Sequence, residues 1–186
     1  MADINSELLS RRRAPVDQSP GRSPAPDSDP HLVTFVELLF FAYRDFTREA
    51  DAALAEFGLG RAHHRVLHFV NRNPGMKVAD LLDILRITKQ SLGRVLKQLV
   101  DQGYVLQKEG PNDRRHRLLY VTPKGEALAM KLAGLQSARI AQALAAFGPG
   151  AHESARQFLT AMMDADGRDG VLRFVARADR TRRQRS

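Results

Sequence analysis

Cysteine and tryptophan are both absent from the 186 residues of this chain. Without cysteine, the protein has no disulfide framework, no cysteine-ligated zinc site and no redox-sensing thiol. Long apolar runs are absent too: the most apolar segment, residues 32–43, contains Glu37 and stops at Arg44, whereas a membrane-spanning helix needs about 20 apolar residues. The N-terminus has no apolar stretch typical of a signal peptide. We therefore expect a soluble, cytoplasmic protein that does not cross a membrane.

Catalytic patterns are missing as well. The sequence contains no phosphate-binding loop, no nucleophile elbow and no carboxylate pair at a spacing that indicates an acid–base cleft. A chain of this length corresponds to one domain with tails, at ~100–200 residues per domain. We therefore expect no enzymatic activity and no cofactor.

Positive charge is the most conspicuous property that the chain does have. Its formal net charge is +8 and its isoelectric point is about 10.4. Residues 76–124 carry 10 Lys or Arg against 5 Asp or Glu, and residues 173–186 carry 6 Arg against 1 Asp, so each region has a net charge of +5. Such a balance favours a polyanionic partner, either nucleic acid or an anionic membrane surface.

The first 30 residues differ from the rest in composition. They hold five of the nine prolines and no aromatic residue, so they bury too little apolar surface to offset the entropy of ordering. We expect residues 1–30 to be a disordered arm. Its basic run, Arg11 to Arg13, is either a solvated charge run or a contact to phosphates.

Apolar residues recur at helical spacing through most of the remaining chain. This periodicity predicts helices at residues 31–57, 61–71, 79–85, 89–102, 123–147 and 151–163. Strands are predicted at 104–108 and 117–121, with a very short one at 76–78. After a polar interruption at 164–170, we expect a last helical piece at 171–176 and a basic tail at 177–186.

The order helix–helix–turn–helix–strand–loop–strand predicts a winged helix-turn-helix in a mainly α protein with a small β-wing. Thr88 is a suitable N-cap for the helix at 89–102, and Gly103 is the expected left-handed stop. In this fold one helix fits the major groove of DNA, and a basic hairpin reaches the neighbouring backbone or the minor groove.

The helix at 89–102 has two contrasting faces. Its apolar stripe consists of Leu92, Val95, Leu96, Leu99 and Val100. Its outward face, with the preceding cap, offers Thr88, Lys89, Gln90, Ser91, Arg94, Lys97 and Gln98. Arginine pairs with guanine and glutamine with adenine, whereas the lysines are expected to hold phosphates. The alternative is that this basic face is only solvated.

A basic loop joins the two predicted strands. Its DNA-binding candidates are Asp113, Arg114, Arg115 and Arg117. An isolated arginine at a loop tip loses rotamer entropy when it enters a groove, and a carboxylate such as Asp113 can hold Arg115 extended beforehand. The alternative is a turn that only adds solubility.

Residues 61–125 resemble the core of a MarR-family transcriptional regulator. The resemblance rests on five segments: Val78-Ala-Asp-Leu-Leu82, Thr88-Lys-Gln-Ser-Leu-Gly-Arg-Val-Leu96, Leu99-Val-Asp-Gln-Gly-Tyr-Val105, Asp113-Arg-Arg115 and Val121-Thr-Pro-Lys-Gly125. Flanking helices extend it over residues 31–175. The run Gly60-Arg-Ala-His-His-Arg-Val-Leu67 is similar to the PetP-like branch of the family.

The resemblance implies roles for individual residues. Ser91 and Arg94 match recognition-helix positions that face DNA, Arg115 matches a wing arginine that enters the minor groove, and Asp113 matches its supporting carboxylate. The sequence departs from the family at Gly93, where Ser or Thr is frequent, which puts one base or phosphate contact in doubt.

The terminal helices are expected to form a homodimer. The apolar stripe containing Phe35, Leu39 and Phe46 is wider than a surface helix with one buried side needs, and a partner chain is one way to bury the second side. The family resemblance implies the same interface, to which we also assign Leu159, Met162 and Met163.

Three histidines, His63, His64 and His68, form the other conspicuous cluster. The pair at i and i+4 suits a metal or haem, but no Asp, Glu or Cys at matching spacing completes a site in the segment. We therefore expect structural, hydrogen-bonded histidines and no metal. A place in an effector pocket is the alternative.

These observations favour a homodimeric DNA-binding transcriptional regulator on a pseudo-palindromic double-stranded operator, associated with the nucleoid. The family resemblance implies that a small-molecule effector modulates binding. The main alternative is a non-specific architectural protein that binds DNA or RNA through its arginine-rich segments, and an enzyme is the third.

Overall fold

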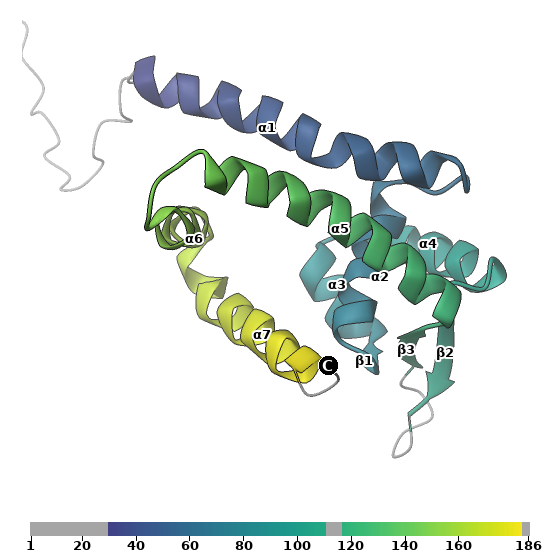
Figure 1. The fold of residues 1–186 in the computed structure, drawn as a ribbon. Helices are drawn as coiled ribbons and strands as arrows, with labels where there is room; N and C mark the ends of the chain where they lie inside the picture. The colour runs from purple at the N-terminus through teal and green to yellow at the C-terminus, as the bar shows by residue number, and fades with distance from the viewer. Residues whose placement is uncertain (1–29, 111–116, 184–186) are drawn as a thin grey trace, which may run out of the picture. The chain divides into compact units, whose positions relative to one another are not determined.

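The computed structural model describes residues 30–110 and 117–183, which are coloured in Figure 1. They form seven helices: α1 (Pro30–Ala55), α2 (Arg61–Arg72), α3 (Val78–Leu85), α4 (Lys89–Asp101), α5 (Pro123–Ala145), α6 (Ala151–Ala161) and α7 (Ala165–Arg183). Three strands complete the described part: β1 (Met76–Lys77), β2 (Val105–Glu109) and β3 (Arg117–Val121). The predicted mainly α class with a small β-wing is confirmed. The expected disorder of residues 1–30 concerns residues outside the described part, except for Pro30, which begins α1.

The chain divides into two compact units, residues 1–41 and 42–186. In the first unit, the described residues are the opening turns of α1, where eight large apolar side chains are exposed. The second unit contains the end of α1, all other elements and the hydrophobic core. The predicted DNA-binding elements therefore all belong to one unit.

Local sequence signals set the boundaries of the helix-turn-helix. The turn between α3 and α4 is made by Arg86, which has a left-handed backbone with φ 50°. The Thr88 hydroxyl accepts the Ser91 N–H at 3.1 Å and so caps α4. At the other end, Gly103 has φ +73°, the left-handed conformation that stops a helix. The predicted turn, cap and stop are all confirmed.

The sheet has the strand order β1-β3-β2, with both pairs antiparallel. Val105 lies opposite Val121 at the start of the hairpin, and Met76 lies opposite Leu119. The hairpin runs from the end of α4 to the start of α5, so it forms the wing of the fold (Figure 1). Its tip, including Asp113, Arg114 and Arg115, lies outside the described residues.

One core holds these elements together. Leu67 of α2, Leu81 of α3, Leu92 and Leu99 of α4, and Leu132 of α5 are fully buried in it. Four of the five residues of the predicted α4 stripe are buried, but Val100 is 37% exposed at the edge of the stripe. The core therefore fixes which face of α4 is turned outward.

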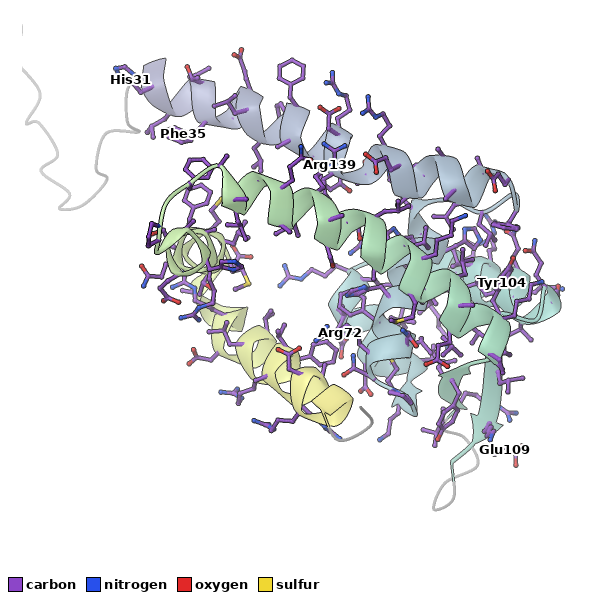
Figure 2. All side chains as sticks on the ribbon, viewed as in Figure 1. His31, Phe35, Arg72, Tyr104, Glu109 and Arg139 are labelled. Atoms are coloured by element: carbon purple, nitrogen blue, oxygen red, sulfur yellow. The ribbon has the colours of Figure 1, made fainter. Side chains whose placement is uncertain are left out.

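The C-terminal helix corrects one prediction. The interruption expected at 164–170 does not exist, because α7 runs from Ala165 through the supposed tail to Arg183. Gly167 and Gly170 lower helix propensity, which is why the segment has the pattern of a break. Tertiary contacts compensate: the Phe174 ring lies 6.1 Å from that of Phe69, and Ala178 is 3% exposed. Arg72 of α2, which is labelled in Figure 2, also forms an ion pair with Asp179 of α7.

The junction between the wing and α5 requires a glycine. An added Cβ at Gly125 would lie 2.0 Å from the Tyr104 carbonyl oxygen, an impossible approach. The Thr122 hydroxyl accepts the Gly125 N–H at 3.0 Å and donates to the Gly103 carbonyl at 2.7 Å. Pro123 occupies the first helical position. The first turn of α5 thus packs directly against residues 103–104, which join α4 to β2.

Gly125→Ala should lower the free energy of unfolding by about 1–3 kcal/mol, because the backbone must shift to admit the methyl group. Gly134→Ala in the same helix is the matched control, since nothing lies within 4 Å of its Cβ position. That control should be neutral or stabilise the protein by up to about 1 kcal/mol. Urea unfolding of both variants measures the difference, and equal stabilities would contradict the close approach at Gly125.

Candidate nucleic-acid interface

The outward face of α4 carries the predicted base-reading residues. Lys89, Gln90, Ser91 and Arg94 are all exposed, on the side opposite the buried leucines. The positive end of the helix dipole lies at this N-terminus and adds to the charge of Lys89. The structure therefore presents one polar, cationic helix face on a rigid core, which is the arrangement that major-groove reading needs.

Two hydroxyls at the start of α4 are hydrogen bonded to each other. The Thr88 hydroxyl donates to the Ser91 Oγ at 2.9 Å, in addition to accepting the Ser91 N–H. Both residues are exposed. Thr88 consequently orients the side chain of Ser91 in addition to capping α4.

Two further cationic side chains of the predicted interface form ion pairs. Lys97 pairs with Asp101 one turn along α4, and Arg117 pairs with Glu109 at 3.0 Å across the base of the wing. Glu109 lies at the end of β2, where the described part of the hairpin stops (Figure 2). All four side chains are at least half exposed, and exposed pairs contribute little free energy. A phosphate can replace either carboxylate at small cost.

His63 lies at the start of α2 and is fully engaged in hydrogen bonds. Its Nδ1 accepts the Gly60 N–H at 3.1 Å, and its Nε2 lies 2.9 Å from Oε1 of Gln98 on α4. Gln98 was predicted on the outward face of α4, but its side chain is turned toward the start of α2. Sequence reasoning missed this bridge because the two residues are 35 positions apart.

His64 and His68 lie one turn apart on α2. Burial lowers the pKa of His64, while the nearby Asp51 carboxylate acts in the opposite direction. Burial is also the main cause that lowers the pKa of His68, with smaller contributions from Arg72 and His64. Burial therefore favours the neutral form of both rings. Within residues 30–110 and 117–183, no three His, Asp or Glu side chains are arranged to hold a metal.

Large apolar side chains are exposed on the terminal helices. In the first unit they include Phe35 and Leu39 of α1, and Figure 2 labels Phe35 near the start of that helix. In the second unit Leu159 and Met162 are exposed, whereas Phe46 and Met163 are half-buried. None of the described helices is long and apolar enough to cross a bilayer.

These elements define a winged helix-turn-helix: α3, a tight turn and α4, followed by a β-hairpin and seated on α2 and α5. The model of the MarR family matches residues 57–116. The HTH-type transcriptional regulator PetP of Rhodobacter capsulatus is 46% identical over 137 residues, which cover 74% of this chain and 82% of PetP. The chain belongs to the MarR family, whose members are transcriptional regulators and not enzymes.

Other known proteins are similar over shorter or more divergent stretches. The HTH-type transcriptional repressor Mb2911 of Mycobacterium bovis is 30% identical over 97 residues, covering 52% of this chain and 70% of the repressor. FabT of Streptococcus pneumoniae, solved in complex with DNA, has a TM-score of 0.64 at 15% identity and covers 70% of this chain and 94% of its own. A mutant MarR from E. coli, complexed with operator DNA, has a TM-score of 0.58 at 19% identity, with coverages of 74% and 99%. The two structures share the fold.

The lowered pKa of His64 predicts how stability depends on pH. The unfolded chain binds a proton near the ordinary histidine pKa of about 6.5, whereas the folded protein resists protonation at His64. Stability should therefore be constant above neutral pH and fall as the pH drops through 6.5. Urea midpoints between pH 7.5 and pH 5.5 measure this fall.

His64→Gln removes one of the two histidines whose pKa is lowered by burial, so it should make that dependence shallower and leave the part due to His68. His152→Gln, which changes an exposed histidine on α6, is the control and should keep the wild-type profile. Identical pH profiles for the wild type and His64→Gln would show that His64 has no part in it.

Proposed function

We propose that this regulator is a homodimer that binds a pseudo-palindromic DNA operator sequence-specifically at the nucleoid. The observation that carries the proposal is the exposed polar face of α4, with Lys89, Gln90, Ser91 and Arg94 turned outward by the burial of the opposite face. Solved structures of two family members with the same fold contain DNA, which supports the choice of partner.

Within this proposal the residues of α4 divide by chemistry. Arg94 and Gln90 read base edges in the major groove, because their side chains form bidentate pairs with guanine and adenine. Ser91, oriented by Thr88, makes a shorter contact. Lys89 and Lys97 hold phosphates and fix the register without specifying a sequence.

The wing supplies the second contact to each half-site. Arg115, supported by Asp113, enters the neighbouring minor groove, while Arg114 and Arg117 contact phosphates. The pairing of Arg117 with Glu109 at 3.0 Å places that side chain at the base of the wing. The narrow minor groove of A·T-rich DNA attracts an inserted arginine most strongly.

Dimerisation through the terminal helices presents two copies of α4 about one DNA turn apart. The exposed apolar residues Phe35 and Leu39 on α1, Leu159 on α6 and Met162 directly after α6 support this interface. Phe46 and Met163, both half-buried, complete the proposed set.

Light scattering at micromolar concentration should give about twice the protomer mass of 20.8 kDa. Replacing Phe35 and Leu39 together by lysine should shift the mass toward that of one protomer, because two charges then occupy the apolar surface. The control replaces Lys131, an exposed residue of α5, by alanine and should remain dimeric. A wild-type mass of one protomer would contradict the proposed dimer.

A small-molecule effector completes the proposal, with its pocket beside the histidines of α2. His63 already has partners for both ring nitrogens, so His64 and His68 are the better candidates for ligand contact. The effector changes DNA affinity only if it has different affinities for two states of the dimer. In our proposal these states differ in the spacing between the two copies of α4.

A second candidate function is non-specific binding to DNA or RNA. It is favoured by exposed arginines along α7, among them Arg173, Arg177 and Arg180. Such binding depends steeply on salt and is removed by any competitor duplex, whereas a sequence-specific regulator retains its operator in the presence of unrelated DNA.

Arg94→Ala should weaken operator binding by about 1–3 kcal/mol per contact and relax the preference at one or two base pairs. Arg115→Ala should also weaken binding, with a sequence effect confined to A·T-rich steps, and Asp113→Ala should be a milder version of it. Binding is measured on a duplex that the wild-type protein enriches from a random pool. Lys131→Ala serves as the charge control. If Arg94→Ala and Arg115→Ala both kept wild-type affinity as folded dimers, the assignment of the DNA-binding face would be wrong.

A further inference from the structure

A chain of three hydrogen bonds links α4, through His63 of α2, to the segment between α1 and α2, residues 58–60. The Gly60 N–H donates to Nδ1 of His63 at 3.1 Å, and Nε2 of His63 lies 2.9 Å from Oε1 of Gln98. Nε2 of Gln98 then donates to the Gly58 carbonyl at 3.0 Å. Both side chains are partly shielded from solvent. The chain of bonds begins and ends on the same three-residue backbone segment.

The partners leave only one arrangement of donors and acceptors. A backbone N–H can only donate, so Nδ1 of His63 accepts and the ring proton must sit on Nε2. That N–H donates to Oε1 of Gln98, which leaves the Gln98 amide nitrogen for the Gly58 carbonyl. Turning the Gln98 amide over would place two donors together and two acceptors together. The hydrogen bonds therefore form in only one orientation of the Gln98 amide and one tautomer of His63.

This connection constrains α4 in a way that its core packing does not. Leu92, Leu96 and Leu99 hold the helix against the core, but apolar contact is not directional. Gln98 lies one turn beyond Arg94, and residues four apart share a side of a helix. Fixing Gln98 to the α1–α2 segment therefore limits how far α4 can rotate and where Arg94 points.

We propose that His63 is a positioning residue for DNA recognition: acting through Gln98, it sets the orientation of the α4 reading face relative to the α1–α2 segment. The inference rests on the proposed function of α4. It also removes Gln98 from the base-reading residues, because both ends of its amide are used within the protein.

A purely structural role for His63 is the competing explanation. His63 is the third residue of α2, and a side chain at this position that accepts the N-cap N–H stabilises a helix start by itself. Two conservative variants separate the roles. His63→Asn places an oxygen near the position of Nδ1 and keeps the cap, but it has no atom near Nε2. His63→Gln places its amide nitrogen near Nε2 and can still donate to Gln98.

The test uses a duplex that the wild-type protein enriches from a random pool, and a shuffled duplex of equal length. His63→Asn and Gln98→Met should each raise the Kd for the enriched duplex roughly five- to tenfold, the effect of about one hydrogen bond. The Kd for the shuffled duplex should not change. His63→Gln should stay within about twofold of the wild type, and the double variant His63→Asn/Gln98→Met should bind like either single variant.

Gln142→Met, at an exposed position on α5, controls for the glutamine-to-methionine change and should bind like the wild type. Wild-type affinity of folded His63→Asn would overturn the inference, because His63 would then only cap α2. Equal weakening of both duplexes by Gln98→Met would also overturn it, since Gln98 would then contact phosphate directly. If the wild-type protein enriched no sequence, the proposed function would fail and this inference with it; enrichment with unaffected variants would overturn the inference alone.

Discussion

Leucine side chains from α4 fill the centre of the winged core, and their burial decides which residues of the helix face outward. Leu92 and Leu99 are almost completely removed from solvent. At about 25 cal/mol per Å² of apolar surface, rotating this stripe out of the core is far more costly than any contact that the polar face makes. The polar face of α4 is thus turned outward because the opposite face is buried, and neighbouring elements only refine its direction.

Much of this architecture could be predicted because the signals are local. Thr88, Gly103 and the pair Thr122-Pro123 act through backbone groups within a few residues, so their effect is visible in the sequence. The sequence did not reveal contacts between distant residues. The polar segment 164–170 is predicted as a break, whereas the docking of α7 depends on contacts such as the pairing of Arg72 with Asp179, which are 107 positions apart.

The candidate site was predictable to the same degree. The exposed residues of α4 follow from helical periodicity, and the structure places Lys89, Ser91 and Arg94 where the pattern indicates. Gln98 shares that periodicity, yet its amide bonds to His63 and to Gly58. Periodicity gives the direction of a Cα–Cβ bond, but it does not say whether a long side chain then folds back onto the protein. The roles of His63 and Gln98 therefore required coordinates.

The docking of α7 changes what its arginines can do. On a flexible tail, each arginine would lose conformational freedom when it met an anion, and that loss would weaken the encounter. On α7 the backbone is already ordered, because Ala178 is buried and Asp179 is paired with Arg72. Arg173 and Arg180 consequently project from an ordered helix that is held against α2, so less conformational freedom is lost when they meet an anion. A polyanion would therefore meet positive charge along one helix of fixed direction, so the orientation in which it approached would affect the contacts that it makes.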